Sequence, residues 1–389
     1  MTVDASVFLR RNAADVIPLD EFESKLAKGR PLRVKLGLDP TAEHVTLGWA
    51  VVLRKLREFQ DLGHTAVLIV GDFTAQIGDP SGKDETRPML SKDEVDAYAK
   101  RVLDQFGLIL SKDNLEIRRN SEWLDDLGTA GLMKIATNYT VARMLERNDF
   151  ADRYEKGESI TMREFMYPLL QGYDSVAVDA DVELGGTDQH FNLMVARHLQ
   201  RAMGQEEQVV FEMPLLEGTD GVQKMSQSLG NYIGVTEEPD EMYGKLMRFP
   251  DGSVEKFLRL STPLGDEEIA MILDRPPQIA KRGLAHEVVT LYHGRDAAIA
   301  AAERFDKVFV EHEVPGDIPS FEINGDGDVF LPQLLQDIGF TTSNGEGRRL
   351  IDQGGIHLGG DVVRAENVSA SQLRGRVLKV GKRRFVRLV

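Results

Sequence analysis

The sequence has no cysteine among its 389 residues. This absence excludes disulfide bonds, thiolate zinc sites and cysteine nucleophiles, and it fits a reducing compartment. No apolar run approaches the ~18 residues that a membrane-spanning helix needs. The N-terminus also lacks the long apolar stretch of a signal peptide. We therefore expect a cytoplasmic protein without a membrane span.

Excess positive charge is absent too, because 63 acidic side chains outweigh 47 basic ones and give a net charge of −16. This balance argues against broad, non-specific binding of nucleic acid. Residues 329–389 are different, with 10 Lys and Arg against 5 Asp and Glu. A basic end on an acidic body suggests a polyanion-binding module or an ordinary solvated surface, and charge alone leaves both open.

The first part of the chain alternates predicted strands and helices. In residues 32–38 apolar residues occupy alternate positions, and a turn follows. Residues 47–62 carry apolar residues on one helical face, and residues 66–71 form a continuous apolar run. This strand, helix and strand make a βαβ unit, which predicts a parallel sheet. Further strands are predicted at 115–118, 175–184 and 208–213.

The remaining pattern predicts the domain organisation. Residues 238–310 are nearly all helical, with a break at Pro276-Pro277, and 315–328 are rich in Gly, Pro and Asp. Short strands and helices return after that stretch. We predict a doubly wound α/β catalytic domain over 1–235, a helical domain over 236–314, a linker over 315–328 and a small α+β domain over 329–389.

Three segments could carry chemistry. The first, 39–49, lies between the end of a strand and the start of a helix, where open parallel sheets bind ligands and helix N-termini favour phosphate. Gly48 would let a nucleotide lie close to the backbone. Alone, this segment is weak support, since other turns between a strand and a helix would look similar.

The second segment, Gly78–Lys83, is not a P-loop, because its glycines are one residue too close and Asp84 follows the lysine. It is either a simple turn or a site in which Asp79 binds an ammonium group while Lys83 and Arg87 face phosphates. The third segment, Lys224–Asn231, is either a mobile loop that presents a cation and hydroxyls or an ordinary exposed loop.

In this order the three segments resemble those of the class I aminoacyl-tRNA synthetases, and within them the tyrosyl-tRNA synthetase family. The first is similar to the segment that leads into the family's His-x-Gly-His motif, the second to its other nucleotide loop, and the third to its Lys-Met-Ser-Lys-Ser loop. Residues 167–174 and 185–189 look like its amino-acid pocket. Residues 343–355 are similar to a small RNA-binding domain shared with a ribosomal small-subunit protein.

The resemblance implies a Rossmann-like catalytic fold and a tyrosine–tRNA ligase that forms tyrosyl-adenylate from ATP and transfers tyrosine to tRNA(Tyr). It implies catalytic roles for Lys83, Arg87, Lys224, Thr41 and Thr46. It implies ATP binding by Asp39, Thr41, Gly48, Trp49, Gly186, Asp188, Lys224, Met225 and Ser226. It implies tyrosine binding by Gly37, Asp79, Tyr167, Gln171, Asp174 and Gln189, and tRNA binding by Arg348, Arg349, Lys382, Arg383 and Arg384.

The implied chemistry needs no side-chain nucleophile, because the tyrosine carboxylate attacks the α-phosphorus of ATP. The protein aligns two anions and stabilises charge on the leaving pyrophosphate. Asp174 would accept a hydrogen bond from the phenol, and an indole substrate would leave it unpaired. Mg²⁺ is expected on the ATP phosphates, without a protein cage, since no metal-ligand spacing occurs among the histidines. The family is homodimeric through a segment inserted between the halves of the catalytic fold.

The chain departs from the family's motifs at three positions. Thr46 and Trp49 stand where the two motif histidines are expected, and Gln227 replaces the second lysine of the mobile loop. Losing one transition-state donor typically costs about 3–4 kcal/mol. His44 is a candidate substitute, although an i, i+2 offset normally points elsewhere. The alternative is therefore a weakened paralogue that binds tyrosine or RNA. The retained cationic loops and the intact pocket favour an active ligase.

Overall fold

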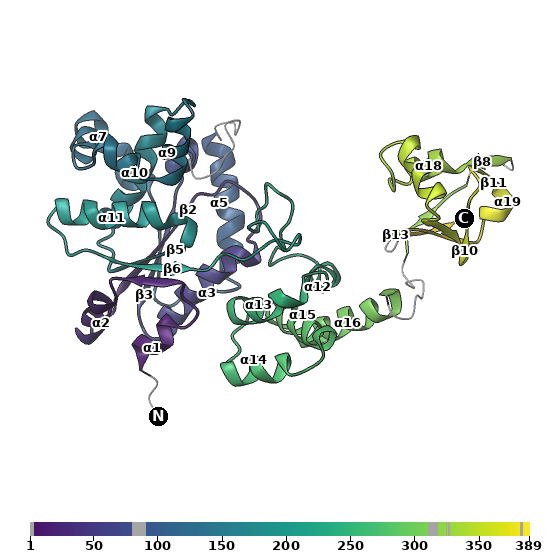
Figure 1. Ribbon diagram of the computed structural model, residues 1–389, viewed down its shortest axis with the longest axis horizontal. Coiled ribbons are helices and arrows are strands. Elements are labelled where there is room, and N and C mark those ends of the chain that lie inside the picture. The colour runs from purple at the N-terminus through teal and green to yellow at the C-terminus, as the bar shows by residue number, and fades with distance from the viewer. Residues whose placement is uncertain (1–3, 80–90, 310–317, 324, 326, 382–383) are drawn as a thin grey trace. The chain divides into compact units, whose positions relative to one another are not determined.

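The computed structural model describes residues 4–79, 91–309, 318–323, 325, 327–381 and 384–389. The chain divides into two compact units, Met1–Gly294 and Arg295–Val389, which run from purple to green and from green to yellow in Figure 1. In the described residues no helix has both the length and the apolarity to cross a membrane.

A six-stranded sheet forms the centre of the first unit. Its strands are β1 (Asp15–Ile17), β2 (Arg33–Leu38), β3 (Thr65–Val70), β4 (Leu115–Arg119), β5 (Val182–Gly186) and β6 (Val209–Met213). Their order is β1-β6-β5-β2-β3-β4. All neighbours are parallel except β1, which lies antiparallel to β6 at the edge. The predicted parallel sheet is therefore confirmed.

Helices cover both faces of this sheet, with α10 and α11 above it and α1 and α2 below it in the view of Figure 1. The helices that precede residue 203 are α1 (Ala5–Arg10), α2 (Leu19–Ala27), α3 (Leu47–Asp61), α4 (Thr74–Ile77), α5 (Lys92–Phe106), α6 (Ser121–Leu124), α7 (Gly128–Ala136), α8 (Val141–Met144), α9 (Asn148–Glu155), α10 (Met162–Ala177) and α11 (His190–Ala202). Two 3₁₀ turns, Asp125–Leu127 and Thr187–Gln189, complete this part. The arrangement confirms the predicted doubly wound α/β class.

Strands β2, β3 and β5 are parallel neighbours, so their carboxyl ends lie along one edge of the sheet. The chain leaves β2 through Asp39, leaves β3 through Gly71 and leaves β5 through Thr187. In open parallel sheets this edge binds ligands. The fold therefore gathers three separate segments of the sequence at one place.

The strand predicted over 175–184 is wrong in its first half. Residues up to Ala177 belong to α10, which a capping box of Thr161 and Glu164 begins, and the strand β5 starts only at Val182. Asp179 ends the helical run with a φ of 49°. The apolar residues at the start of this range end the helix at Val176 and Ala177, and Val178 and Ala180 are buried in the connection after it.

Residues 239–309 are almost wholly helical, as predicted. The helices are α12 (Pro239–Leu246), α13 (Val254–Ser261), α14 (Asp266–Leu273), α15 (Pro277–His293) and α16 (Arg295–Phe309), with a 3₁₀ turn at Asp251–Ser253. The Pro276-Pro277 pair separates α14 from α15. Pro277 occupies the first turn of α15, where its missing N–H costs no hydrogen bond.

After α16, the second unit builds its own core from short elements. These are β7 (Ser320–Phe321), β8 (Asp328–Phe330), α17 (Leu331–Asp337), α18 (Asn344–Asp352), β9 (Ile356–Leu358), β10 (Asp361–Val362), β11 (Asn367–Ser369), α19 (Ala370–Leu373), β12 (Val377–Val380) and β13 (Arg384–Leu388). The sheets run β10-β9-β12-β13-β7 and β11-β8. Leu331, Leu335, Leu373 and Leu378 are fully buried between them.

This fold includes part of the stretch predicted as a linker. Strand β7 pairs in parallel with β13, and Ile323 is buried in the same core. The Gly, Pro and Asp content predicted a linker, and within it two residues of strand and one buried isoleucine pack with the second unit. The other domain boundaries remain predictions.

Candidate functional site

The turn after β2 places Asp39 in the centre of a hydrogen-bonded group. Tyr167 on α10 donates its hydroxyl to Asp39 Oδ2 at 2.7 Å, and Thr74 at the start of α4 donates to Asp39 Oδ1 at 2.7 Å. Gly71 makes this approach possible, because a Cβ there would lie 2.0 Å from Asp39 Oδ1 and 2.4 Å from Thr74 Oγ1. Residues predicted from different motifs therefore meet directly.

Asp174, about two helical turns after Tyr167 on α10, belongs to the same group and is 2% exposed. The Trp123 Nε1–H donates to its Oδ1 at 2.9 Å, and Asn120 donates to its Oδ2 at 3.3 Å. Asn120 also donates to Thr74 Oγ1 at 2.9 Å. One continuous network thus joins Asp174 to Thr74 and Asp39.

The two carboxyl groups of this network are expensive to ionise. Burial raises the pKa of Asp39 to about 7, against the opposing hydrogen bonds from Thr74 and Tyr167. Burial also raises the pKa of Asp174 to about 7, although Lys35, Trp123 and Asn120 favour its charged form. Carboxyl groups of this kind, in a site that can receive a cationic or hydrogen-bonding ligand, are typical of binding sites.

The predicted pocket residues Gln171, Gln189 and Asp79 are joined by Asn192. Asn192 Nδ2 donates to Gln171 Oε1 and to Gln189 Oε1, both at 3.0 Å. Gln189 Nε2 donates in turn to Asp79 Oδ2 at 3.3 Å. Arg147 donates to Asn192 Oδ1 at 3.3 Å and lies 3.9 Å from Asp79. The wall of the pocket is therefore fixed by side-chain amides.

Lys35 lies beneath this pocket in β2 and is fully buried. Its Nζ donates to Glu183 Oε1 at 2.8 Å, to Ser175 Oγ at 2.8 Å and to the Gln171 carbonyl at 3.0 Å. Three acceptors satisfy the ammonium group completely. Gly37, on the same strand, has open space where a Cβ would stand. The predicted position of Gly37 beside a ligand fits this opening.

A second group of predicted residues lies at the same edge of the sheet. Lys224 forms an ion pair with Asp188, and Gly186 precedes it at the end of β5. A Cβ on Gly186 would lie 2.5 Å from Asp188 Oδ1, so a larger residue there would displace the Asp188 side chain. Because Asp188 is adjacent to Gln189, this group shares a turn with the pocket wall.

The first and third predicted segments also meet. Met225 packs on Gly48, where an added Cβ would lie 3.6 Å from Met225 Cβ. Backbone bonds from Leu47 N–H to the Ile233 carbonyl and from Val235 N–H to the Val45 carbonyl close the loop onto the start of α3. Ser226 N–H donates to Asn231 Oδ1 at 2.8 Å, which braces the loop internally.

Thr46 has a structural role that the sequence did not suggest. It is the N-cap of α3, its Oγ1 accepts from the Trp49 N–H at 3.3 Å, and it is 2% exposed. Trp49 and Thr41 are half-buried. Their predicted roles toward ATP remain predictions.

Some predicted residues lie elsewhere. Lys83, Arg87, Lys382 and Arg383 fall outside the described residues. Arg348, Arg349 and Arg384 belong to the second compact unit. Arg348 pairs with Glu366 at 3.1 Å, Arg349 is exposed, and Arg384 donates to the Phe340 carbonyl and lies over its ring.

Several residues of the site escaped sequence reasoning. Thr74, Asn120, Trp123, Asn192 and Arg147 come from segments without a recognised motif. A signal existed for Trp123, because the chain has only two tryptophans. The others are polar residues whose proximity depends on the fold.

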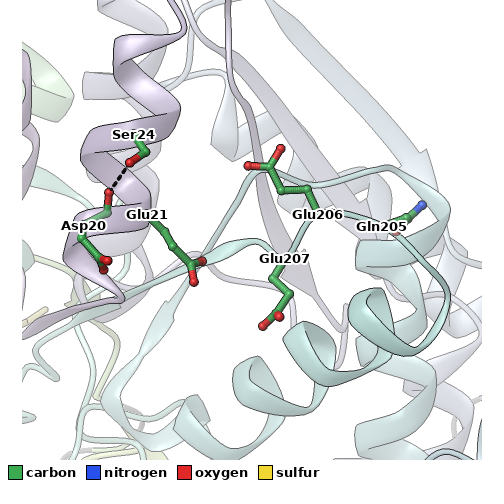
Figure 2. A pocket seen from close by; sticks show the side chains of 6 residues that line it. All are labelled: Asp20, Glu21, Ser24, Gln205, Glu206 and Glu207. Carbon is green, nitrogen blue, oxygen red and sulfur yellow. Dashed lines mark hydrogen bonds between the residues drawn. The ribbon is translucent and has the colours of Figure 1, made fainter.

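A cavity of about 350 Å³ lies away from these residues, between α2 and the turn before β6 (Figure 2). It is lined by Asp20, Glu21, Ser24, Gln205, Glu206 and Glu207. Its glutamates already have cationic partners: Arg197 lies 2.9 Å from both Glu21 and Glu207, and Lys28 lies 2.7 Å from Glu206. We therefore place no ligand there.

Comparison with known proteins identifies the class. The sequence profile of the class I tRNA synthetases for tryptophan and tyrosine matches residues 27–310, and the chain belongs to this family. Solved structures agree on the fold: a truncated mitochondrial tyrosyl-tRNA synthetase from Aspergillus nidulans matches with a TM-score of 0.66 at 21% identity, over 78% of this chain and 93% of its own. The enzyme from Archaeoglobus fulgidus, complexed with L-tyrosine, matches with a TM-score of 0.62 at 23% identity, over 77% and 99%.

Relatives that match over almost the full length of the chain indicate the tyrosine enzymes within this family. A tyrosine–tRNA ligase of Moorella thermoacetica is 48% identical over 98% of this chain and 94% of its own length. One of Thermotoga maritima is 48% identical over 100% and 98%. The predicted tyrosine–tRNA ligase activity is confirmed by this similarity, and a weakened paralogue is not favoured.

Proposed function

We propose that the network around Asp39 and Asp174 is the tyrosine pocket. Asp174 accepts the phenol hydroxyl, while Asp79, Tyr167, Gln171 and Gln189 surround the ammonium end. Three features support this assignment: the buried acceptor, the open space at Gly37 and the amide-lined wall. A phenylalanine in this pocket would bring no hydroxyl donor to Asp174, so the buried carboxylate would keep only its bonds from Trp123 and Asn120 and would be less well satisfied.

ATP occupies the neighbouring face in this proposal. Asp39, Thr41, Gly48 and Trp49 contact it from the start of α3, Gly186 and Asp188 from the end of β5, and Lys224, Met225 and Ser226 from the loop. Lys83, Arg87 and Lys224 neutralise charge on the phosphates, and Thr41 and Thr46 donate hydroxyl protons. Mg²⁺ enters with ATP and is held by its phosphates, because Mg²⁺ usually retains water and phosphate ligands.

One observation carries the proposal: the turn 186–189 links both faces, with Asp188 on Lys224 and Gln189 on Asp79. A carboxylate held in the pocket would therefore lie beside a nucleotide held under the loop. Such alignment is most of what this reaction requires, because the substrate supplies its own nucleophile.

The test is tyrosine-dependent exchange of labelled pyrophosphate into ATP. The wild-type chain should exchange with tyrosine and not with tryptophan. Asp174→Asn should lower kcat/KM for tyrosine about 10- to 100-fold, through the lost charged acceptor. Asp179→Asn is the matched control, because Asp179 is exposed at a positive φ that asparagine accepts. Equal losses in both variants would contradict the assignment of Asp174.

Two partner proposals complete the function. The described chain from β4 to the first residue of α10 exposes large hydrophobic side chains, namely Met133 at 60%, Val141 at 58%, Tyr154 at 67% and Met162 at 71%. These support a homodimer through the inserted segment. The tRNA would bind the second unit through Arg348, Arg349, Lys382, Arg383 and Arg384, where cations meet phosphates.

A further inference from the structure

Gln227 stands where the family's mobile loop carries its second lysine. In this chain its side chain forms hydrogen bonds with the backbone of His44, 183 residues earlier in the sequence. The His44 N–H donates to Gln227 Oε1 at 3.2 Å, and Gln227 Nε2 donates to the His44 carbonyl at 2.6 Å. The side-chain amide thus imitates a strand partner. A lysine could not do this, because an ammonium group donates but cannot accept.

The segment that Gln227 holds is itself fixed on both sides. Gln105 on α5 accepts from Val45 N–H at 2.8 Å and donates to the Glu43 carbonyl at 2.7 Å. The isolated bridge between Thr46 and Gly234 fixes the next residue. The His44 ring also stacks on Tyr232, with centroids 6.1 Å apart and an interplanar angle of 23°. Gln227 therefore attaches the loop to a rigid support.

Lys224 and Gln227 lie three residues apart on one internally braced loop. Asn231 is 6% exposed, and it holds the Ser226 N–H at 2.8 Å and the Lys224 carbonyl at 3.2 Å. Lys224 binds Asp188, and its side chain is 52% exposed. Such a partly exposed pair is weak, so Lys224 can exchange Asp188 for a phosphate at little cost. The amide bonds to His44 make no use of Lys224 and persist during that exchange.

We propose that Gln227 is a positioning residue that holds the loop 224–231 closed on the start of α3, so that Lys224 already lies over the nucleotide face before ATP arrives. This inference rests on the proposed role of Lys224 toward the phosphates. The apparent affinity for ATP falls in proportion to the fraction of molecules whose loop is closed and ready to bind. A loop that is already held closed therefore binds ATP more tightly, because no binding energy is used to close it. The chain thereby replaces a second charge with preorganisation.

Gln227→Met tests the proposal, because methionine keeps the length of the side chain and removes both hydrogen bonds. Leu229→Ala is the control on the same loop, since Leu229 is 56% exposed. Two measurements are made on the full chain: trypsin cleavage after Lys224 without nucleotide, followed by mass spectrometry, and KM for ATP in pyrophosphate exchange.

We expect faster cleavage in Gln227→Met and a five- to tenfold rise in KM for ATP, with kcat within about twofold, because saturating ATP closes the loop again. Leu229→Ala should match the wild type in both. Unchanged cleavage and KM in Gln227→Met, with an active wild type, would overturn the role of Gln227 alone. A fall in kcat without a rise in KM would also overturn it, because the amide would then act in the transition state. A wild type without exchange would instead overturn the proposed function.

Discussion

Tyrosine binding should weaken as the pH falls below about 7, because ionised Asp174 accepts the hydrogen bond from the phenol much more strongly than protonated Asp174 does. Burial raises the pKa of this carboxyl to about 7 in the empty pocket. A group with that pKa is only about 3% ionised at pH 5.5, so the affinity should be about 30-fold below its value above pH 8. Asp39 has a pKa of about 7 as well and acts in the same direction.

The variant Trp123→Phe distinguishes the contribution of Asp174 to this pH dependence from that of Asp39. The indole N–H donates to Asp174 at 2.9 Å and favours its charged form, whereas Asp39 has no bond to Trp123 among its described contacts. Losing this bond should raise the pKa of Asp174 by about one unit, which corresponds to about 1.4 kcal/mol. Affinity for tyrosine should then fall about fivefold at pH 7 and return to within about twofold of wild type at pH 8.5.

Equilibrium dialysis with labelled tyrosine between pH 5.5 and 8.5 measures both effects without ATP. The recovery at high pH is decisive, because Trp123 also packs against the cluster of Val67, Ile69 and Val178. A packing defect would weaken binding equally at every pH. Either that outcome or a wild-type affinity that does not vary with pH would refute the proposed dependence on ionised Asp174.

Three further predictions concern the loop, the second unit and stability. Lys224→Met should lower kcat for pyrophosphate exchange about 100-fold, as the loss of one transition-state donor does, with little change in Tm because its ion pair is partly exposed. Deleting residues 310–389 should spare pyrophosphate exchange and abolish tRNA charging, and charging by the truncated chain would disprove the RNA-binding role. In the full chain, the affinity for tRNA should fall by ~0.7–0.9 log units per log unit of salt concentration for each phosphate contact. Asp174→Asn should stabilise the empty protein at pH 8 by about 1–3 kcal/mol and should not stabilise it at pH 4. The raised pKa of Asp174 means that ionising this carboxyl group as the pH rises destabilises the folded protein, and asparagine cannot ionise. The loss of one hydrogen-bond acceptor in the variant opposes this gain. Urea unfolding at both pH values measures this difference.

Local patterns sufficed for much of the sheet. The run over 66–71 is apolar at every position because β3 is covered on both faces, and it predicted a buried parallel strand. The prediction failed at 175–184, where the end of a helix and the connection after it carry apolar residues at alternate positions, as a strand does. A short run cannot separate these two cases without the neighbouring capping box at Thr161.

The sequence indicated the residues of the candidate site that belong to recognised motifs. It did not indicate the residues that form hydrogen bonds to those motif residues. Asp39, Tyr167 and Asp174 were found from their segments, but Asn120 and Thr74 join them only because the carboxyl ends of β3 and β4 lie at the same edge. No sequence spacing encodes a hydrogen bond between residues 46 positions apart. Such contacts follow from strand order, which was not predicted.

The altered nucleotide motif has a physical reading that the sequence alone did not offer. Thr46 is 2% exposed and its oxygen already caps α3, so it offers at most one proton to a phosphate. Charge stabilisation must therefore come from cations that reach the open face. Lys224 is such a cation, and its position depends on a loop that Gln227 holds against His44. In the proposed function, Lys224, Lys83 and Arg87 supply the positive charge in the transition state, while Gln227 keeps Lys224 in place before ATP binds and so lowers the KM for ATP. If Gln227→Met left the KM for ATP untouched, the position of Lys224 would not depend on Gln227.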